Sequence, residues 1–198
     1  MSDYSELFDK DFREGREDAV LTNKATQRYS VAFGLVANLK FEKALDVGCA
    51  NGRFAGYLAY RNEFWGIDIS ETAIGQAKEY WKHMPNRFHF TVGNLTSIPF
   101  PDSMFDLISC LDVIYYLDNP SRRKAADELA RVLKPNGYLL ISTSWPWRTK
   151  TRTGTSYMKE WEVEILLAKN FTLLRDAKTS GRLGFWTGAA MLFRYESQ

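Results

Sequence analysis

The chain has 198 residues, a length that predicts a single domain. Hydrophobic residues make up 45% of the sequence and charged residues 25%, so a packed core is expected and extensive disorder is excluded. Lysine and arginine exceed aspartate and glutamate by only 26 to 24, a balance that gives no indication of a nucleic-acid partner.

Cysteine usage and hydropathy narrow the class of protein further. Cys49 and Cys110 are the only cysteines, and no cysteines pair at metal-ligand spacing, so neither a zinc site nor a disulfide framework is predicted. The amino-terminal stretch MSDYSELFDKDFREGRED is charged and lacks the apolar segment of a secretion signal. No apolar run approaches the roughly 18 residues of a membrane span. We therefore expect no metal, no membrane contact and a cytoplasmic location.

Residues 1–40 are predicted to be helical. Apolar side chains recur there at helical spacing in two groups, Leu7, Phe8 and Phe12, then Tyr29, Phe33, Val36 and Ala37. No strand pattern appears in this segment. We expect a helical extension that covers part of the domain that follows it.

Strand and helix patterns alternate along the rest of the chain. Apolar or alternating runs predict strands at 44–47, 63–69, 87–94, 105–111, 137–145, 171–179 and 185–196. Helical patterns lie at 53–61, 71–84, 121–134 and 157–168, with Ser70 as a candidate N-cap and Pro135-Asn136-Gly137 as a stop signal. This alternation indicates an α/β fold, with a parallel sheet covered by helices on both faces, in one domain over residues 1–198.

The turn after the first predicted strand is the first candidate site. Ligands of such sheets bind outside the carboxyl ends of the strands. The turn reads Asp46-Val-Gly48-Cys-Ala50-Asn-Gly52, and its small residues would let the backbone approach a ligand closely. An ordinary strand-to-helix turn is the alternative. A dinucleotide-binding G-x-G-x-x-G motif is excluded, because Arg53 stands where its third glycine is required.

Asp68 is the second candidate. It closes the second predicted strand, twenty residues after Gly48. An acidic side chain at that place can accept hydrogen bonds from both hydroxyls of a ribose. The alternative is a capping aspartate beside Ser70. The position and the spacing together favour the ribose.

The pattern of an acidic residue, a glycine, a small residue and a second glycine resembles the motif of Rossmann-like S-adenosylmethionine-dependent methyltransferases. That resemblance implies a seven-stranded, mostly parallel sheet with the last strand antiparallel, in three layers, and amino-terminal helices that form a lid. It also implies that the turn, at Asp46, Gly48, Ala50 and Gly52, passes the methionine part of the cofactor. Ala50 departs from the usual middle glycine, which costs on the order of 1 kcal/mol if φ is positive there.

The resemblance continues through the segments VGNLTSIPF and LARVLKPNGYLLIS. It assigns the cofactor's adenosine to Asp68 and Ile69, and its adenine to Asn94 and the Leu95 backbone. Position 94 is commonly an aspartate that accepts from the adenine amino group. Asn94 is a departure, although an amide oxygen can also accept.

The end of the fourth predicted strand would receive the methyl acceptor. The resemblance implies that the Leu111 backbone contacts the amino-acid end of the cofactor. It also makes Arg28 a candidate to bind the carboxylate of the cofactor. The run from Asp112 to Leu117, with Tyr115 and Tyr116, is similar to that of the nodulation-factor N-methyltransferases, and it implies that Asp112 orients an amine or takes its proton and that Tyr116 contacts the acceptor. In the alternative, Asp112 caps the next turn and the tyrosines pack in the core.

The remaining chemistry-bearing residues are less specific. His83 and His89 fall inside a helix and a strand pattern, and structural roles are expected for both. Trp145 and Trp147 can wall the site or belong to the core, and the cations of residues 148–154 are read as a solvated loop rather than a site for an acidic substrate.

The sequence therefore predicts an S-adenosylmethionine-dependent methyltransferase that acts on an amine or hydroxyl of a small molecule and releases S-adenosyl-L-homocysteine. An RNA or protein methyltransferase is one alternative, although no D/N-P-P-Y/F tetrapeptide ends the fourth strand. A protein that binds the cofactor without methyl transfer is the other. The acceptor and the oligomeric state are not predicted.

Overall fold

The computed structural model describes residues 4–15, 26–58, 62–144, 151, 153–180 and 186–196. One sheet contains β1 (Lys43–Val47), β2 (Glu63–Asp68), β3 (Phe88–Val92), β4 (Phe105–Cys110), β5 (Leu133–Ser144), β6 (Phe171–Ser180) and β7 (Trp186–Tyr195). The helices are α1 (Ser5–Arg13), α3 (Thr26–Val36), α4 (Ala55–Leu58), α5 (Glu71–Trp81), α6 (Asn119–Val132), α7 (Glu160–Leu167) and the 3-10 helix η2 (Ile114–Tyr116).

The seven strands lie in the order β3-β2-β1-β4-β5-β7-β6. The pairs from β3 to β5 are parallel, and β7 runs antiparallel to both of its neighbours, β5 and β6, as expected. The chain moves outward from β1 to β3 and then returns to place β4 on the other side of β1. This reversal between β1 and β4 is where ligands bind to sheets of this kind.

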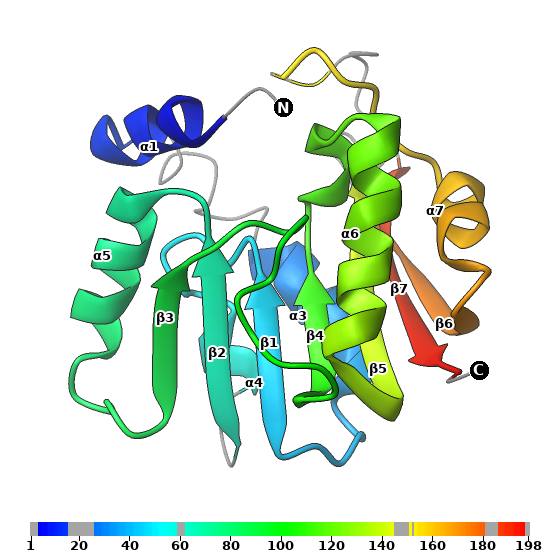
Figure 1. Ribbon diagram of the computed structural model, residues 1–198, viewed down its shortest axis with the longest axis horizontal. Coiled ribbons are helices and arrows are strands. Elements are labelled where there is room, and N and C mark those ends of the chain that lie inside the picture. The colour runs from blue at the N-terminus through cyan, green and yellow to red at the C-terminus, as the bar shows by residue number, and fades with distance from the viewer. Residues whose placement is uncertain are drawn as a thin grey trace.

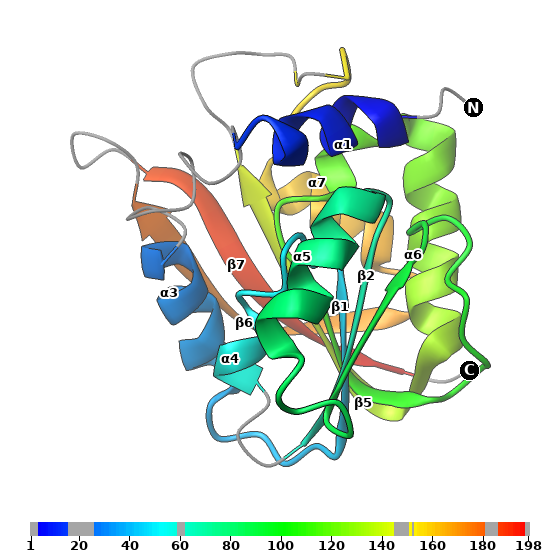
Figure 2. The same cartoon turned by 90° about the vertical axis from the view of Figure 1, so that its left-hand side faces the viewer.

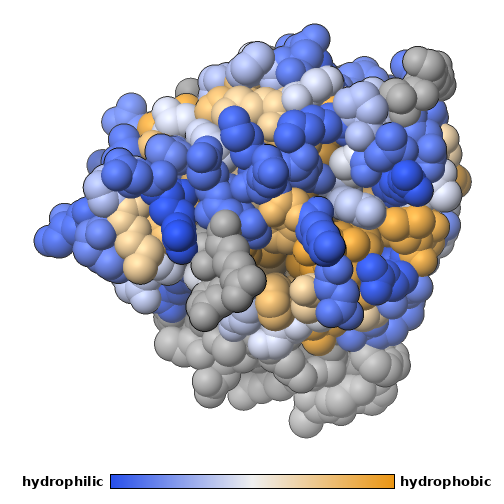
Figure 3. All heavy atoms as spheres, turned by 90° about the horizontal axis from the view of Figure 1, so that it is seen from below, coloured by the Kyte–Doolittle hydropathy of each residue, from blue (hydrophilic) through white to orange (hydrophobic). Residues whose placement is uncertain are grey.

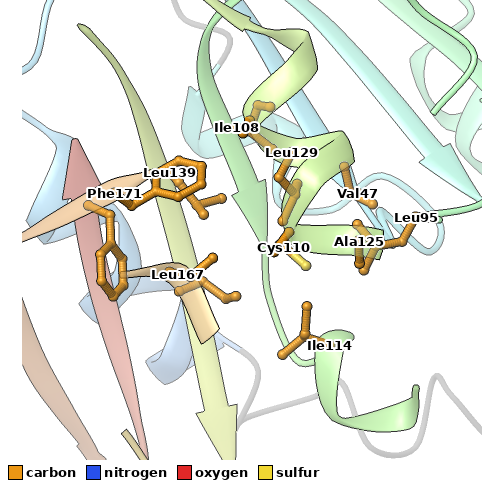
Figure 4. Packing of buried hydrophobic residues seen from close by; sticks show 14 of the residues in the cluster. Val47, Leu95, Ile108, Cys110, Ile114, Ala125, Leu129, Leu139, Leu167 and Phe171 are labelled. Carbon is orange, nitrogen blue, oxygen red and sulfur yellow. The ribbon is translucent and has the colours of Figure 1, made fainter. Parts of the chain in front are cut away.

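Helices cover both faces of the sheet (Figures 1 and 2), which confirms the predicted three layers. On one face, α3, α4 and α5 pack on apolar residues that include Ala44, Phe64 and Leu107. On the other face, α6 and α7 pack on the residues shown in Figure 4, where Leu129 lies near Ile108 and Leu167 lies near Phe171. β1 and β4 are almost fully buried, which explains their continuous apolar runs.

The ends of the helices follow the capping signals in the sequence. Ser70 caps α5 and accepts a hydrogen bond from the Ala73 N–H, as predicted. Asp118 caps α6 in the same way. The sequence predicted that this helix ends at residue 134, but α6 ends two residues earlier, at Val132. β5 begins at Leu133, so the predicted stop signal Pro135-Asn136-Gly137 lies inside the strand. Leu133 already pairs with Phe105, which explains the early start of β5.

The two amino-terminal helices take different positions. α1 lies beyond the carboxyl ends of β2 and β3, above α5, which is the place of the expected lid (Figures 1 and 2). α3 instead lies against the face of the sheet, where Ala32, Leu35 and Val36 are buried. Arg28, in the first turn of α3, reaches Asp112 beyond the carboxyl end of β4.

At the opposite end of the sheet, no helix among the described residues crosses the strands as α1 does. Figure 3 shows this face, where hydrophilic residues surround smaller hydrophobic areas. Among the described residues, no helix is both long enough and apolar enough to cross a membrane.

Two glycines provide a matched test of this packing. A Cβ on Gly66 in β2 would lie 2.7 Å from Phe90 Cδ1 and 2.8 Å from Cys49 Sγ, whereas a Cβ on Gly75 in α5 would meet nothing within 4 Å. Gly66→Ala should therefore lower the free energy of unfolding by about 1–3 kcal/mol. Gly75→Ala should raise it by up to about 1 kcal/mol, because alanine favours the helix. Urea unfolding measures both, and equal effects of the two substitutions would contradict the packing described.

Candidate functional site

The turn after β1 has the backbone of a ligand-binding loop. Gly48, Ala50 and Gly52 have φ values of 75°, 50° and 76°, so the small residues coincide with left-handed backbone. The N–H groups of Gly48 and Cys49 both donate to the Ile67 carbonyl oxygen, at 2.8 and 3.0 Å. The predicted strain at Ala50 is therefore present, at a cost on the order of 1 kcal/mol. The loop keeps this shape because β2 holds it.

Asp68 joins the tips of β1 and β2. Its Oδ2 accepts from the Ala50 N–H at 3.0 Å, and its Oδ1 accepts from the Ser70 N–H at 3.0 Å. Burial raises the pKa of Asp68, although these backbone donors oppose the shift. Each carboxylate oxygen has a second lone pair, so both can still accept from the hydroxyls of a ligand. Asp68 therefore lies beside the N-cap, as the alternative required, and also faces the turn.

Asp46 lies beneath the turn and is almost fully buried, with 3% of its surface exposed. The Ser109 hydroxyl donates to Asp46 Oδ1 at 2.6 Å. Burial raises the pKa of Asp46 to about 7, because the ionised form is poorly solvated there, and the Ser109 hydrogen bond offsets only part of this effect. A cationic ligand above the turn would favour the ionised form.

Asp112 follows β4 with a φ of 60°, a conformation that is strained for a residue with a side chain. Its N–H donates to Ser142 Oγ at 2.8 Å, and that hydroxyl in turn donates to Asp112 Oδ1 at 3.1 Å. Arg28 Nη1 lies 2.7 Å from Asp112 Oδ2. Ser142 was not predicted from the sequence, because a serine inside β5 carries no signal of a role at the neighbouring strand.

Arg28 and Asp112 line a small pocket between α3 and the ends of β4 and β5. Its walls are formed by Arg28, Tyr29, Ala32, Leu111, Asp112, Ser142, Thr143 and Ala190. Burial would lower the pKa of Arg28, but Asp112 and nearby tyrosines raise it overall. Within the described part of the chain, the buried Thr143 hydroxyl has no hydrogen-bond partner. The pocket is thus lined on one side by polar and charged groups.

Tyr116 lies under the lid. The ring of Phe8 in α1 meets the Tyr116 ring edge-on, with 5.2 Å between centroids. The Thr153 hydroxyl donates to the Tyr116 carbonyl oxygen at 2.9 Å, and the Thr155 hydroxyl donates to the Tyr115 carbonyl oxygen at 2.6 Å. Tyr115 is buried, which agrees with the alternative in which the tyrosines pack in the core, whereas Tyr116 is only partly buried. Tyr116 is therefore the tyrosine that a ligand could reach.

α1 is attached to the site by a side chain that sequence reasoning missed. Asp9 Oδ1 accepts from the Ser70 hydroxyl at 2.7 Å and from the Thr72 N–H at 2.8 Å. The Thr72 and Ser70 donors lower the pKa of Asp9. Asp9 thus caps the amino terminus of α5, and an aspartate on one helix gives no sequence signal that it caps another.

The loop after β3 lies next to the carboxyl end of β2. Gly93 donates its N–H to the Asp68 carbonyl oxygen at 2.9 Å, which brings Asn94 beside Asp68. Asn94 Oδ1 accepts from the Thr96 N–H at 2.9 Å and from the Thr96 hydroxyl at 3.0 Å. Leu95 is buried, and Ile69 is partly buried directly after Asp68. The residues predicted to bind one cofactor therefore lie along neighbouring strand ends.

The two histidines have surroundings that fit the structural roles expected of them. His89 stacks on Trp65, with 4.9 Å between ring centroids, and His83 is exposed after α5. Trp145, Trp147 and the cations Arg148, Lys150 and Arg152 lie outside the described residues.

The arrangement suits a cationic ligand with vicinal hydroxyls. Three carboxylates, from Asp46, Asp68 and Asp112, stand at the ends of β1, β2 and β4 around a turn of small residues. Only Asp112 has an arginine as ion-pair partner among them in the described part of the chain. Uncompensated carboxylates favour a ligand that carries positive charge.

Comparison with known proteins agrees with this arrangement. Residues 45–141 match the family described as "Methyltransferase domain". A probable methyltransferase of Aspergillus luteorubrus is 33% identical over 65% of the chain and 50% of its own length. The 27-O-demethylrifamycin SV methyltransferase of Amycolatopsis mediterranei is 30% identical over 63% of the chain and 47% of its own. The match thus spans about half the length of these curated relatives.

Solved structures share the fold over a larger part of the chain. The N-methyltransferase NodS of Bradyrhizobium japonicum, in complex with S-adenosyl-L-homocysteine, superposes with a TM-score of 0.83 at 20% identity, over 99% of this chain and 100% of NodS. The [4+2]-cyclase SpnF has a TM-score of 0.71 at 21% identity, over 84% of this chain and 80% of its own.

Asp46 predicts a pH dependence of stability. The pKa of Asp46 is higher in the folded protein than in the unfolded chain, so folding favours the protonated carboxyl. Its contribution to the free energy of unfolding therefore falls as pH rises from about 4 to about 7. Asp46→Asn removes this penalty and keeps an acceptor for Ser109. The stability of the variant relative to the wild type should increase by on the order of 1–3 kcal/mol between pH 5 and pH 8. Urea unfolding across this range measures the change, and a difference that is independent of pH would exclude a raised pKa.

Proposed function

Because the chain carries a class I, S-adenosylmethionine-dependent methyltransferase domain, we propose that it transfers the methyl group of this cofactor to an amine or hydroxyl of a small molecule. S-adenosyl-L-homocysteine is the product. The observation that carries the proposal is the hydrogen bond from the Ala50 N–H to Asp68, which joins the turn and the carboxylate into one cradle. The cradle fits a nucleoside joined to a cationic amino acid.

The cofactor's parts can be assigned to neighbouring strand ends. Asp68 accepts from the ribose hydroxyls, and the turn from Gly48 to Gly52 passes the methionine part. The ionised form of Asp46 offsets the positive charge of the sulfonium and ammonium groups from beneath the turn. Arg28 and Leu111, which line one pocket, hold the carboxylate and the amino group of the methionine part. Asn94 and Leu95 border the adenine.

The methyl acceptor binds between Asp112 and Tyr116, under α1. The cofactor supplies an activated leaving group, so the protein has to align and dehydrate the two reactants. Asp112 is paired with Arg28. When the cofactor's carboxylate engages Arg28, the Asp112 oxygen that faced it becomes available to orient an amine or hydroxyl and to receive its proton. Tyr116 and Phe8 form the wall that excludes water.

The names of similar proteins and the position of α1 over the strand ends both support a small molecule as the methyl acceptor. One relative is named as a methyltransferase of a demethylrifamycin, and a fold neighbour is named as an N-methyltransferase. The sequence that ends β4, Cys110-Leu111-Asp112, lacks the tetrapeptide expected of an enzyme that modifies nucleic-acid bases or glutamine amides.

A second candidate is a cofactor-dependent reaction other than methyl transfer. The cyclase SpnF has the same fold, so the fold alone does not impose methyl transfer. Release of S-adenosyl-L-homocysteine separates the two candidates, because only methyl transfer forms it. A panel of small amines and alcohols, incubated with the protein and S-adenosylmethionine, provides this test. RNA-dependent release would favour the remaining alternative.

Asp68→Ala should weaken binding of S-adenosyl-L-homocysteine by about 1.5–3 kcal/mol, the range for hydrogen bonds to a charged group. Ser70→Ala is the matched control, because it leaves the Asp68 carboxylate in place while it removes the cap of α5 and one of the two hydrogen bonds to Asp9, of which the bond from the Thr72 N–H remains. The control should be less stable by about 1 kcal/mol and bind the ligand almost as the wild type does. Titration calorimetry measures both affinities. If both variants bind equally well, Asp68 has only a structural role.

Asp112→Asn should lower kcat by about a hundredfold or more with whichever acceptor the panel identifies, because general-base assistance is typically of this size. The affinity for S-adenosyl-L-homocysteine should change by less than about threefold. The amide oxygen introduced by this substitution can still accept from the Ser142 hydroxyl, so the fold should be retained. Steady-state kinetics and calorimetry provide the two measurements. An unchanged kcat would assign Asp112 to the capping alternative.

A further inference from the structure

The loop after β3 lies where the adenine ring would extend. β3 flanks β2 on the side away from β1. Because the methionine part is assigned to the turn at β1, the base lies on the opposite side of Asp68, over the segment that begins at Gly93. Leu95 and Ile98 are buried there and provide apolar surface, whereas the Asn94 side chain is exposed. The polar edge of the ring therefore meets Asn94.

The orientation of the Asn94 amide is determined by Thr96. The Thr96 N–H can only donate, so the amide oxygen of Asn94 must face it, and the distance is 2.9 Å. The Thr96 hydroxyl donates to the same oxygen at 3.0 Å. An amide oxygen has two lone pairs, and both are engaged by these donors. The expected use of this oxygen as an acceptor for adenine is therefore not available in this arrangement.

The group that Asn94 offers to a ligand is its amide nitrogen, which only donates. It has no hydrogen-bond partner among the residues that the structure describes. The exocyclic amino group of adenine is also a donor, while the ring nitrogens beside it are acceptors. Two donors cannot form a hydrogen bond with each other.

We propose, on the basis of the proposed function, that Asn94 donates its amide N–H to a ring nitrogen of adenine and leaves the exocyclic amino group without a side-chain acceptor. An aspartate at this position would keep one oxygen on Thr96 and turn its second oxygen toward the amino group. The single exchange of nitrogen for oxygen therefore decides which part of the base is recognised.

The test compares S-adenosyl-L-homocysteine with its purine riboside analogue, in which hydrogen replaces the exocyclic amino group and the ring nitrogens are unchanged. Titration calorimetry gives both affinities for the wild type and for Asn94→Asp. The wild type should bind the two ligands with affinities within about threefold of each other. Asn94→Asp exchanges the donor to the ring nitrogen for an acceptor of the amino group, so it should prefer S-adenosyl-L-homocysteine to the analogue by about tenfold, the effect of one hydrogen bond to a charged group.

The comparison in the wild type requires no variant, so it holds even if Asn94→Asp folds poorly. A wild-type preference for the amino-bearing ligand above about threefold would overturn the inference, and so would a variant that gains less than about fivefold in that preference. Wild-type protein that binds neither ligand would overturn the proposed function and this inference with it. Normal binding without the expected pattern would overturn the inference alone.

Discussion

The Asp68 carboxylate connects the ends of two neighbouring strands, and the rest of the site depends on this connection. One oxygen holds the Ala50 N–H, in the turn after β1, and the other holds the Ser70 N–H, where α5 begins. The turn contains three residues with positive φ, including an alanine for which this backbone is unfavourable. A strained loop persists when its surroundings hold it in place, and here the second strand does so.

Negative charge is concentrated at the same edge of the sheet. Asp46 is buried with a pKa raised to about 7, and burial raises the pKa of Asp68 as well. Both shifts mean that folding gives up stability to keep carboxylates there. Under the proposed function, a cofactor with a sulfonium and an ammonium group offsets this cost. The carboxylates that cost stability are thus the ones that the proposed function assigns to the charged ligand.

The amino-terminal segment contributes to the site from two directions. α1 crosses the carboxyl ends of the strands, attached through Asp9 at the start of α5 and through Phe8 at Tyr116. α3 packs on the sheet and directs Arg28 toward Asp112. α1 therefore contacts both the start of α5, next to Asp68, and Tyr116, next to the proposed acceptor site.

Much of the fold was predictable because it rests on local patterns. Alternating apolar runs and helical periodicity indicated the sheet and its covering layers, and Ser70 indicated the start of α5. The glycine turn and the distant Asp68 could be related to each other because parallel strands bring their carboxyl ends to one edge. The departures Ala50 and Asn94 were also visible in the sequence, although their consequences were not.

Those consequences depend on contacts between residues far apart in the chain, which no local pattern encodes. The pairs Arg28–Asp112 and Asp112–Ser142, and the capping of α5 by Asp9, exist only because the sheet and its helices bring these residues together. The orientation of Asn94 was likewise decided by the fold, since a nearby Thr96 N–H takes the oxygen once the loop closes. The sequence alone thus determined which chemical groups stand at the strand ends, and the tertiary structure decided which of them remain free to meet a ligand, because hydrogen bonds and ion pairs engage the others.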